Sequence, residues 1–106
     1  MQSLIIISAY SYISPRLFES QKSALRQGKQ VISACLSDRW LARLGQPAAF
    51  PEEARAQLAG ALAGVHQVHI VKSAADVEAL QRRYGTRDMA VIDAPALTSL
   101  TSPGGF

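Results

Sequence analysis

The segment of residues 88–95 is the sequence feature that most restricts the folds this chain can adopt. Four apolar residues, 89–92, lead into Asp93, and Pro95 turns the chain two positions later. A short apolar run of this kind predicts a strand of a parallel sheet that is buried on both faces. Ligands of open parallel sheets bind at the carboxyl ends of the strands. Asp93 is therefore predicted to lie at the functional edge of an α/β sheet.

Three further apolar segments, each followed by a helical pattern, repeat this arrangement along the chain. The predicted strands cover residues 4–7, 30–36, 68–71 and 89–92. The predicted helices cover residues 15–27, 38–44, 51–63 and 74–84. Strands that alternate with helices of this length imply right-handed crossovers and a sheet between two helical layers. The predicted fold class is α/β, a small three-layer sandwich with a mainly parallel four-stranded sheet.

Local signals predict where the helices begin and which residues they turn inward. Ser14 and Pro15 are typical of a helix N-cap and a first helical position, and Ser73 with Asp76 matches a capping box. Apolar spacing then assigns the inward face of each helix. The predicted inward residues are Leu17, Phe18, Ala24 and Leu25, then Trp40, Leu41 and Leu44, then Ala54, Leu58, Ala61 and Leu62, and finally Val77, Leu80 and Tyr84.

Length and composition predict one globular domain. The chain has 106 residues, of which 48% are hydrophobic and 18% charged, a balance typical of a folded domain. Residues 1–97 are predicted to form a single α/β domain, and residues 98–106 a flexible C-terminal tail. The apolar N-terminal segment is too short to span a bilayer. The single cysteine, Cys35, excludes an intrachain disulfide, so we expect a cytoplasmic protein without a membrane partner.

Charge and isolated reactive residues exclude several function classes. The net charge is +3, and no basic run is longer than the pair at 82–83. A nucleic-acid groove usually needs a denser basic cluster, so nucleic acid is not an expected partner. His66 and His69 lack neighbouring ligands at metal-binding spacing. Cys35 is expected to be a buried, unreactive thiol, and Trp40 a core residue.

Parallel strands bring the polar residues that follow them to one edge of the sheet. The candidate ligand- or partner-binding residues at that edge are Tyr10, Tyr12, Arg16, Asp38, Arg39, Lys72 and Asp93. Tyr10 and Tyr12 are interpreted as exposed aromatics that suit partner contacts, with packing on the first helix as the alternative. Asp38 and Asp93 also have a structural alternative, since each could cap the helix or turn that follows it. No catalytic residue and no metal ligand is assigned.

Several segments resemble the signal-recognition-type P-loop GTPases, including the flagellar-placement GTPase, over roughly residues 24–97. The matching segments are residues 28–32, 37–39, 44–47, 68–80 and 87–93. The first two are similar to the family's second strand, and the third looks like its LGVP turn. The last two resemble the strand and helix before the Walker B strand, and that strand itself. The resemblance implies a P-loop-like or RecA-like fold and, as a ligand, a Mg-nucleotide.

The chain departs from that family at the phosphate-binding loop. A P-loop needs G-x-x-x-x-G-K-[ST] after the first strand, because the glycines let backbone amides reach the phosphates. Residues 8–16 contain no glycine, and Tyr10 and Tyr12 stand among them. The only cation of that segment is Arg16, and the family's glycine after the Walker B strand is absent after Asp93. Ordinary NTP hydrolysis and a bound cofactor are therefore not expected.

These observations lead to three functional hypotheses. The first is a non-catalytic, P-loop-like or RecA-like module that acts by protein–protein interaction, regulating a larger bacterial ATPase, cell division, motility or DNA transfer. The alternative is a small nucleotide- or phosphate-binding enzyme domain that uses Arg16, Asp38, Lys72 and Asp93, with Mg-nucleotide as its ligand. The third is homo-oligomeric assembly through a sheet edge or an exposed helix face.

Overall fold

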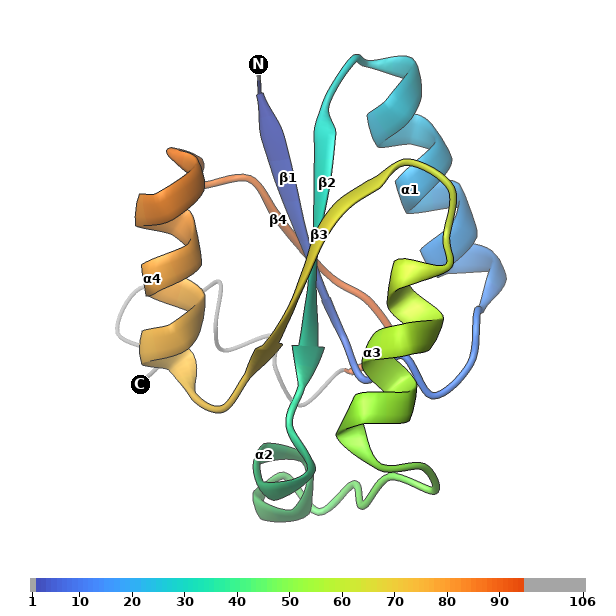
Figure 1. The fold of residues 1–106 in the computed structure, drawn as a ribbon, viewed down its shortest axis with the longest axis vertical. Helices are drawn as coiled ribbons and strands as arrows, with labels where there is room; N and C mark the ends of the chain where they lie inside the picture. Colours follow the sequence, from blue (N-terminus) through green and yellow to red (C-terminus); the bar gives the residue numbers. More distant parts are fainter. Residues whose placement is uncertain (1, 95–106) are drawn as a thin grey trace.

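Strands and helices alternate along the chain in the computed structural model, which describes residues 2–94 (Figure 1). In chain order the elements are β1 (Ser3–Ser8), α1 (Pro15–Arg26), β2 (Gln30–Leu36), α2 (Asp38–Arg43), α3 (Glu52–Gly60), β3 (Val65–Val71), α4 (Ala74–Tyr84) and β4 (Met89–Val91). All the predicted elements are therefore present. The predicted tail, residues 98–106, and the last residues of the predicted domain lie outside the described residues.

The four strands of this part of the chain form one parallel sheet in the order β3-β2-β1-β4. The chain adds β2 and β3 on one side of β1 and then returns to place β4 on the other side. The direction of strand addition thus reverses between β1 and β4. In doubly wound sheets such a reversal opens a crevice at the carboxyl ends of the two strands, because their connections run to opposite faces.

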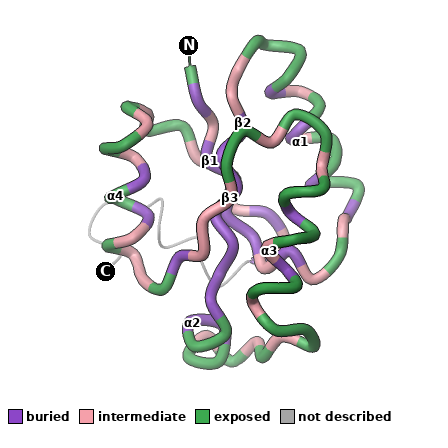
Figure 2. The backbone as a smooth tube through the Cα atoms, in the orientation of Figure 1, coloured by how far each residue is buried: buried purple, intermediate pink, exposed green. Residues whose placement is uncertain are grey.

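Helices cover both faces of the sheet, which confirms the α/β class. On one face α4 and α2 pack against a cluster that includes Ile5, Ile7 and Ile32. On the other face α1 and α3 pack against a cluster that includes Ile6 and Val31. The three consecutive isoleucines of β1 are all fully buried, and Figure 2 shows the buried backbone concentrated in the sheet. Burial on both faces explains why β1 reads as a continuous apolar run.

β4 differs from the prediction of a fully buried strand. It spans Met89–Val91, its three residues are only half-buried, and β1 is its sole partner within residues 2–94. Its existence and parallel direction are as predicted, and its pairing joins Ile5 to Met89 and Ile7 to Val91. An apolar run alone does not reveal whether a strand has one neighbour or two. The prediction of complete burial was wrong for that reason.

The inward face of α1 also differs from the prediction. Leu17 and Ala24 are buried, but Phe18 is 51% exposed and Leu25 is 40% exposed. Gln21 takes the place between the two buried residues, and its amide Nε2 donates to the carbonyl of Ala63 at 2.7 Å. A hydrogen-bonded amide is acceptable in the interior, so a polar residue occupies a core position and two apolar residues remain outside.

The face that α3 buries was predicted wrongly as well. Ala54, Leu58 and Ala61 are exposed, whereas Arg55 and Ala59 are buried. Leu62, which lies after the helix ends at Gly60, is partly buried against the α1 side of the core. Helix α3 is rotated so that the guanidinium group of Arg55 faces the sheet, and the hydrogen bonds of that group account for the rotation.

At the helix N-termini, the predicted capping chemistry is present at α1 but not at α2 or α4, whereas Gly85 ends α4 as predicted. Ser14 Oγ accepts from the amide of Leu17 at 3.1 Å, as expected for an N-cap. Ser37, rather than Asp38, caps α2, since its Oγ accepts from the amide of Trp40 at 3.1 Å. The capping box at α4 is not formed: Ser73 makes no side-chain cap, and Asp76 instead accepts from the amide of Lys72 at 2.8 Å. Trp40 and Leu41 are buried as predicted.

Candidate functional site

The predicted edge residues do not converge on one site. Lys72 follows β3 and Asp93 follows β4, which are the two outer strands of the described sheet. Three strand spacings separate them, or about 14 Å at the usual distance between neighbouring strands. Arg16, Arg39 and Lys72 are all exposed. The edge therefore divides into two regions, one around Asp38 and one around Asp93.

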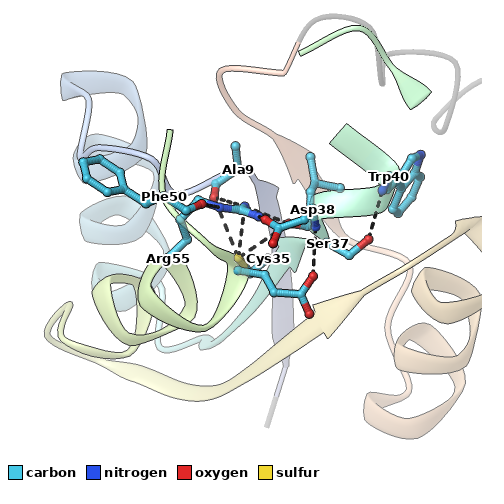
Figure 3. Close-up of polar contacts among 9 residues, drawn as sticks. Ala9, Cys35, Ser37, Asp38, Trp40, Phe50 and Arg55 are labelled. Carbon is cyan, nitrogen blue, oxygen red and sulfur yellow. Dashed lines mark hydrogen bonds and ion pairs between the residues drawn. The ribbon is translucent and has the colours of Figure 1, made fainter. Parts of the chain in front are cut away.

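The region around Asp38 is organised by a buried arginine (Figure 3). Arg55 is 1% exposed and reaches from α3 across the carboxyl ends of β1 and β2. Its Nη1 donates to the carbonyls of Ala9 and Leu36, each at 2.7 Å, and its Nε donates to the carbonyl of Phe50 at 2.9 Å. Its Nη2 pairs with Asp38 Oδ1 at 2.6 Å. The guanidinium thus binds two carbonyls at the ends of β1 and β2, one carbonyl of the loop before α3, and the carboxylate of Asp38 at the start of α2.

Arg55 is the site residue that sequence reasoning missed. A lone arginine in a helix with few large apolar residues is ordinarily read as a solvated side chain. The signal that could have pointed to it is the weak apolar periodicity of residues 52–60, where small alanines leave room for a large side chain. The carbonyl acceptors come from three separate segments, and their meeting is a property of the fold.

Cys35 lies beside this arginine and is buried, as predicted. Its Sγ is 3.6 Å from Arg55 Nη1. Burial raises the pKa of the Cys35 thiol to about 11, and the neighbouring positive charge of Arg55 only partly opposes that rise. The thiol is therefore protonated at neutral pH, and the protonated form is a poor nucleophile and metal ligand.

Tyr10, predicted as an exposed partner-binding residue, is instead buried. Only 1% of it is exposed, and its hydroxyl donates to the carbonyl of Ile6 at 2.9 Å. Its backbone φ is +57°, and its amide donates to Ser8 Oγ at 3.3 Å. Burial raises the pKa of the Tyr10 hydroxyl well above its usual range. The left-handed turn at Tyr10 directs the ring inward, a conformation that residue type alone does not predict. Tyr12, by contrast, is 61% exposed, as predicted.

The N-terminus of α1, where a P-loop protein would hold phosphate, is capped by Ser14 and begins with a proline. Pro15 carries no amide hydrogen. The amide of Leu17 donates to Ser14 Oγ, and the amide of Phe18 donates to the Ser14 carbonyl at 3.0 Å. The exposed side chain of Arg16 adds a positive charge but does not surround a bound phosphate. Ser14 thus occupies one amide at this end of the helix, and Pro15 supplies none.

The region around Asp93 contains a cavity at the point where the strand order reverses. This switch-point pocket has a volume of about 310 Å³ and is lined by residues 8–12, Leu41, residues 46–49 and Asp93. Asp93 has a φ of +58°, and its Oδ2 is buried without a hydrogen-bond partner among the described residues. The carboxylate is thus available for a contact that residues 2–94 do not supply.

The histidines form no metal site within the described residues. His69 Nε2 lies 2.8 Å from the hydroxyl of Tyr84 on α4. Burial lowers the pKa of His69, and the charge of Arg83 lowers it further. Residues 2–94 hold no cluster of three or more His, Cys, Asp and Glu side chains that could ligate an ion. In the same part of the chain no helix is both long enough and apolar enough to cross a membrane.

Fold and site together define an α/β protein with three features in the described residues: an all-parallel sheet, a helix N-terminus capped by Ser14 after β1, and a pocket at the β1/β4 switch point. No protein-family model matches the sequence, and no curated protein matches it significantly.

Proposed function

We propose that this chain is a non-catalytic module, P-loop-like or RecA-like in type, that acts by protein–protein interaction. The observation that carries the proposal is the closure of the loop after β1. Tyr10 fills the interior beneath that loop, Arg55 binds the carbonyl of Ala9, and Ser14 occupies an amide at the start of α1. These side chains and the absence of glycine from residues 8–16 leave less room for a phosphate than the glycine-rich loop of a P-loop protein. A regulatory role toward a larger ATPase, cell division, motility or DNA transfer suits a scaffold of this kind.

The outward face of α1 supports contact with another protein. Phe18 and Leu25 are large apolar residues that the core does not use. Together with Leu62 they line a groove of about 180 Å³, hereafter the α1 groove, which also includes Lys22 close to the Phe18 ring. Adjacent exposed apolar residues on a small domain with a filled core mark a surface that another molecule covers.

The alternative, a phosphate- or nucleotide-binding domain, receives less support from the positions of its residues. Asp38 is paired with Arg55, and Lys72 lies at the opposite edge of the sheet from Asp93. We expect the melting temperature to be unchanged by MgATP or MgGTP. A nucleotide at a hundredfold its Kd would add about 2.7 kcal/mol and raise Tm by roughly 10 °C or more. A saturable rise of that kind, abolished by Asp93→Asn, would establish the alternative.

Partner binding is tested by comparing two surfaces of the same protein. The full chain is purified with its bound proteins from the native host, and the affinity of the recovered partner is measured by calorimetry. We expect the double variant Phe18→Ser, Leu25→Ser to weaken binding about thirtyfold, as removal of an apolar hot spot does. Phe50→Ser is the matched control, because Phe50 is 55% exposed and lies outside the α1 groove. Equal affinities for the wild type and the double variant would exclude this face.

A further inference from the structure

The switch-point pocket has the size and position of a small-molecule site. Its volume of about 310 Å³ lies near the lower end of the range found for ligand pockets. It stands outside the carboxyl ends of β1 and β4, where the strand order reverses. The residues of the closed loop described above form only one wall. The others come from Leu41, the loop of residues 46–49 and Asp93.

The charge of the pocket restricts what it can hold. Asp93 is the only charged residue among the described residues that line it. The buried Oδ2 of its carboxylate has no hydrogen-bond donor within residues 2–94. Because residues 2–94 contribute no Lys or Arg to the lining of this cavity, an anionic ligand such as a nucleotide would meet a negative charge that they do not compensate. A ligand with a positively charged donor would supply what the carboxylate lacks.

Backbone strain is concentrated in the same place. Tyr10 and Asp93 are the two non-glycine residues with positive φ among residues 2–94, and both line the pocket. Such conformations are uncommon for residues with a side chain, more so for Tyr than for Asp, and they cluster where a structure positions groups for function. The strain at Asp93 thus accompanies a carboxylate that has no structural partner in the described chain.

We propose that this pocket binds a small organic ammonium compound. Its ammonium group donates to the Asp93 carboxylate. The ring of Tyr12, which lines the pocket and is 61% exposed, is available at the cavity for a cation–π contact. Leu41 and Pro47 provide apolar surface for a short alkyl chain. This inference is independent of partner binding through the α1 groove, whose residues lie elsewhere on the molecule.

The experiment compares three probes of similar size: n-butylammonium, 1-butanol and butyrate. Each is titrated into the ¹⁵N-labelled full-length protein, and amide shifts are followed by NMR. For so small a cation we expect saturable shifts at residues 8–12 and 93 with a Kd on the order of 1 mM. Butyrate is expected to produce none, and butanol only weak, unsaturated changes.

Two variants and a control locate the interaction. Asp93→Asn keeps a residue that tolerates positive φ and is expected to weaken butylammonium binding about tenfold or more. Tyr12→Leu is expected to weaken it about two- to fivefold. Asp88→Asn is the control, because Asp88 is half-exposed beside Lys29 and does not line the pocket. The proposal is overturned if butylammonium causes no saturable shift, if butyrate binds equally well, or if Asp93→Asn binds like the wild type.

Discussion

Replacing Arg55 by methionine is expected to lower the free energy of unfolding by about 3–5 kcal/mol, the usual loss when one partner of a buried polar network is removed. The variant keeps a long apolar stem but removes the guanidinium donor from the carbonyls of Ala9, Leu36 and Phe50. The weakly donating thiol of Cys35 remains near the first two. Each buried acceptor that loses its partner contributes to the loss. Domains of this size have a total stability of about 5–15 kcal/mol, so the variant would approach the limit of folding at 37 °C.

Urea unfolding at constant pH measures this effect, provided that the slope of the transition is unchanged. Arg39→Met is the matched control, since Arg39 is an exposed arginine on the neighbouring helix α2 and its replacement should alter stability by less than about 0.5 kcal/mol. Asp38→Asn retains an acceptor and all three carbonyl contacts, so we expect an intermediate loss of about 1–2 kcal/mol. Equal midpoints for Arg55→Met and Arg39→Met would contradict a stabilising role for the buried guanidinium.

Replacing Tyr10 by alanine is expected to cost about 3–5 kcal/mol, the loss typical of a buried aromatic side chain. The alanine variant removes a fully packed ring and the hydrogen bond to Ile6, while the unfavourable backbone conformation remains. Tyr12→Ala provides the comparison two residues away, because Tyr12 is mostly exposed and its loss should change stability by less than about 0.5 kcal/mol.

The same measurement separates the ring from its hydroxyl. Tyr10→Phe keeps the ring but leaves the Ile6 carbonyl without the tyrosine donor, so a loss of about 1 kcal/mol is expected. Chemical denaturation of all three variants under identical conditions gives the ranking. If Tyr10→Ala and Tyr12→Ala were equally stable, Tyr10 would be a surface residue, and the sequence-based alternative of packing against the first helix, with which its buried cluster agrees, would be wrong.

Much of the secondary structure was predictable because its signals are local. The consecutive isoleucines of β1 can satisfy burial only in a strand covered on both faces. Ser14 and Pro15 mark the start of α1 because of how they interact with the first amides of the helix. This local chemistry does not depend on tertiary contacts. The alternation of such segments then restricts the fold to a parallel sheet with helical connections.

The candidate site was much less predictable, since its residues are selected by contacts between distant segments. Arg55 is buried because carbonyls from β1, β2 and the loop before α3 converge on one point. Gln21 is buried because the carbonyl of Ala63 faces it. On α1 Gln21 is buried while Phe18 and Leu25 remain exposed. On α3 Arg55 is buried while Ala54 and Leu58 remain exposed. Periodicity assigns apolar residues to the interior and has no means to detect such an exchange.

The stretch from Asp88 to Pro95 shows which features of the fold depend on neighbouring residues and which depend on contacts between distant segments. Apolar patterning determined that a parallel strand is present and that Asp93 follows it, because these depend on neighbouring residues alone. The sheet order placed that strand beside β1 and away from β3, which separated Asp93 from Lys72. The long-range contacts of Arg55 then filled the region around Asp38, and a pocket remained between the turn at Tyr10 and Asp93. Strand order and these contacts arise from packing between remote segments, and only the three-dimensional structure contains them.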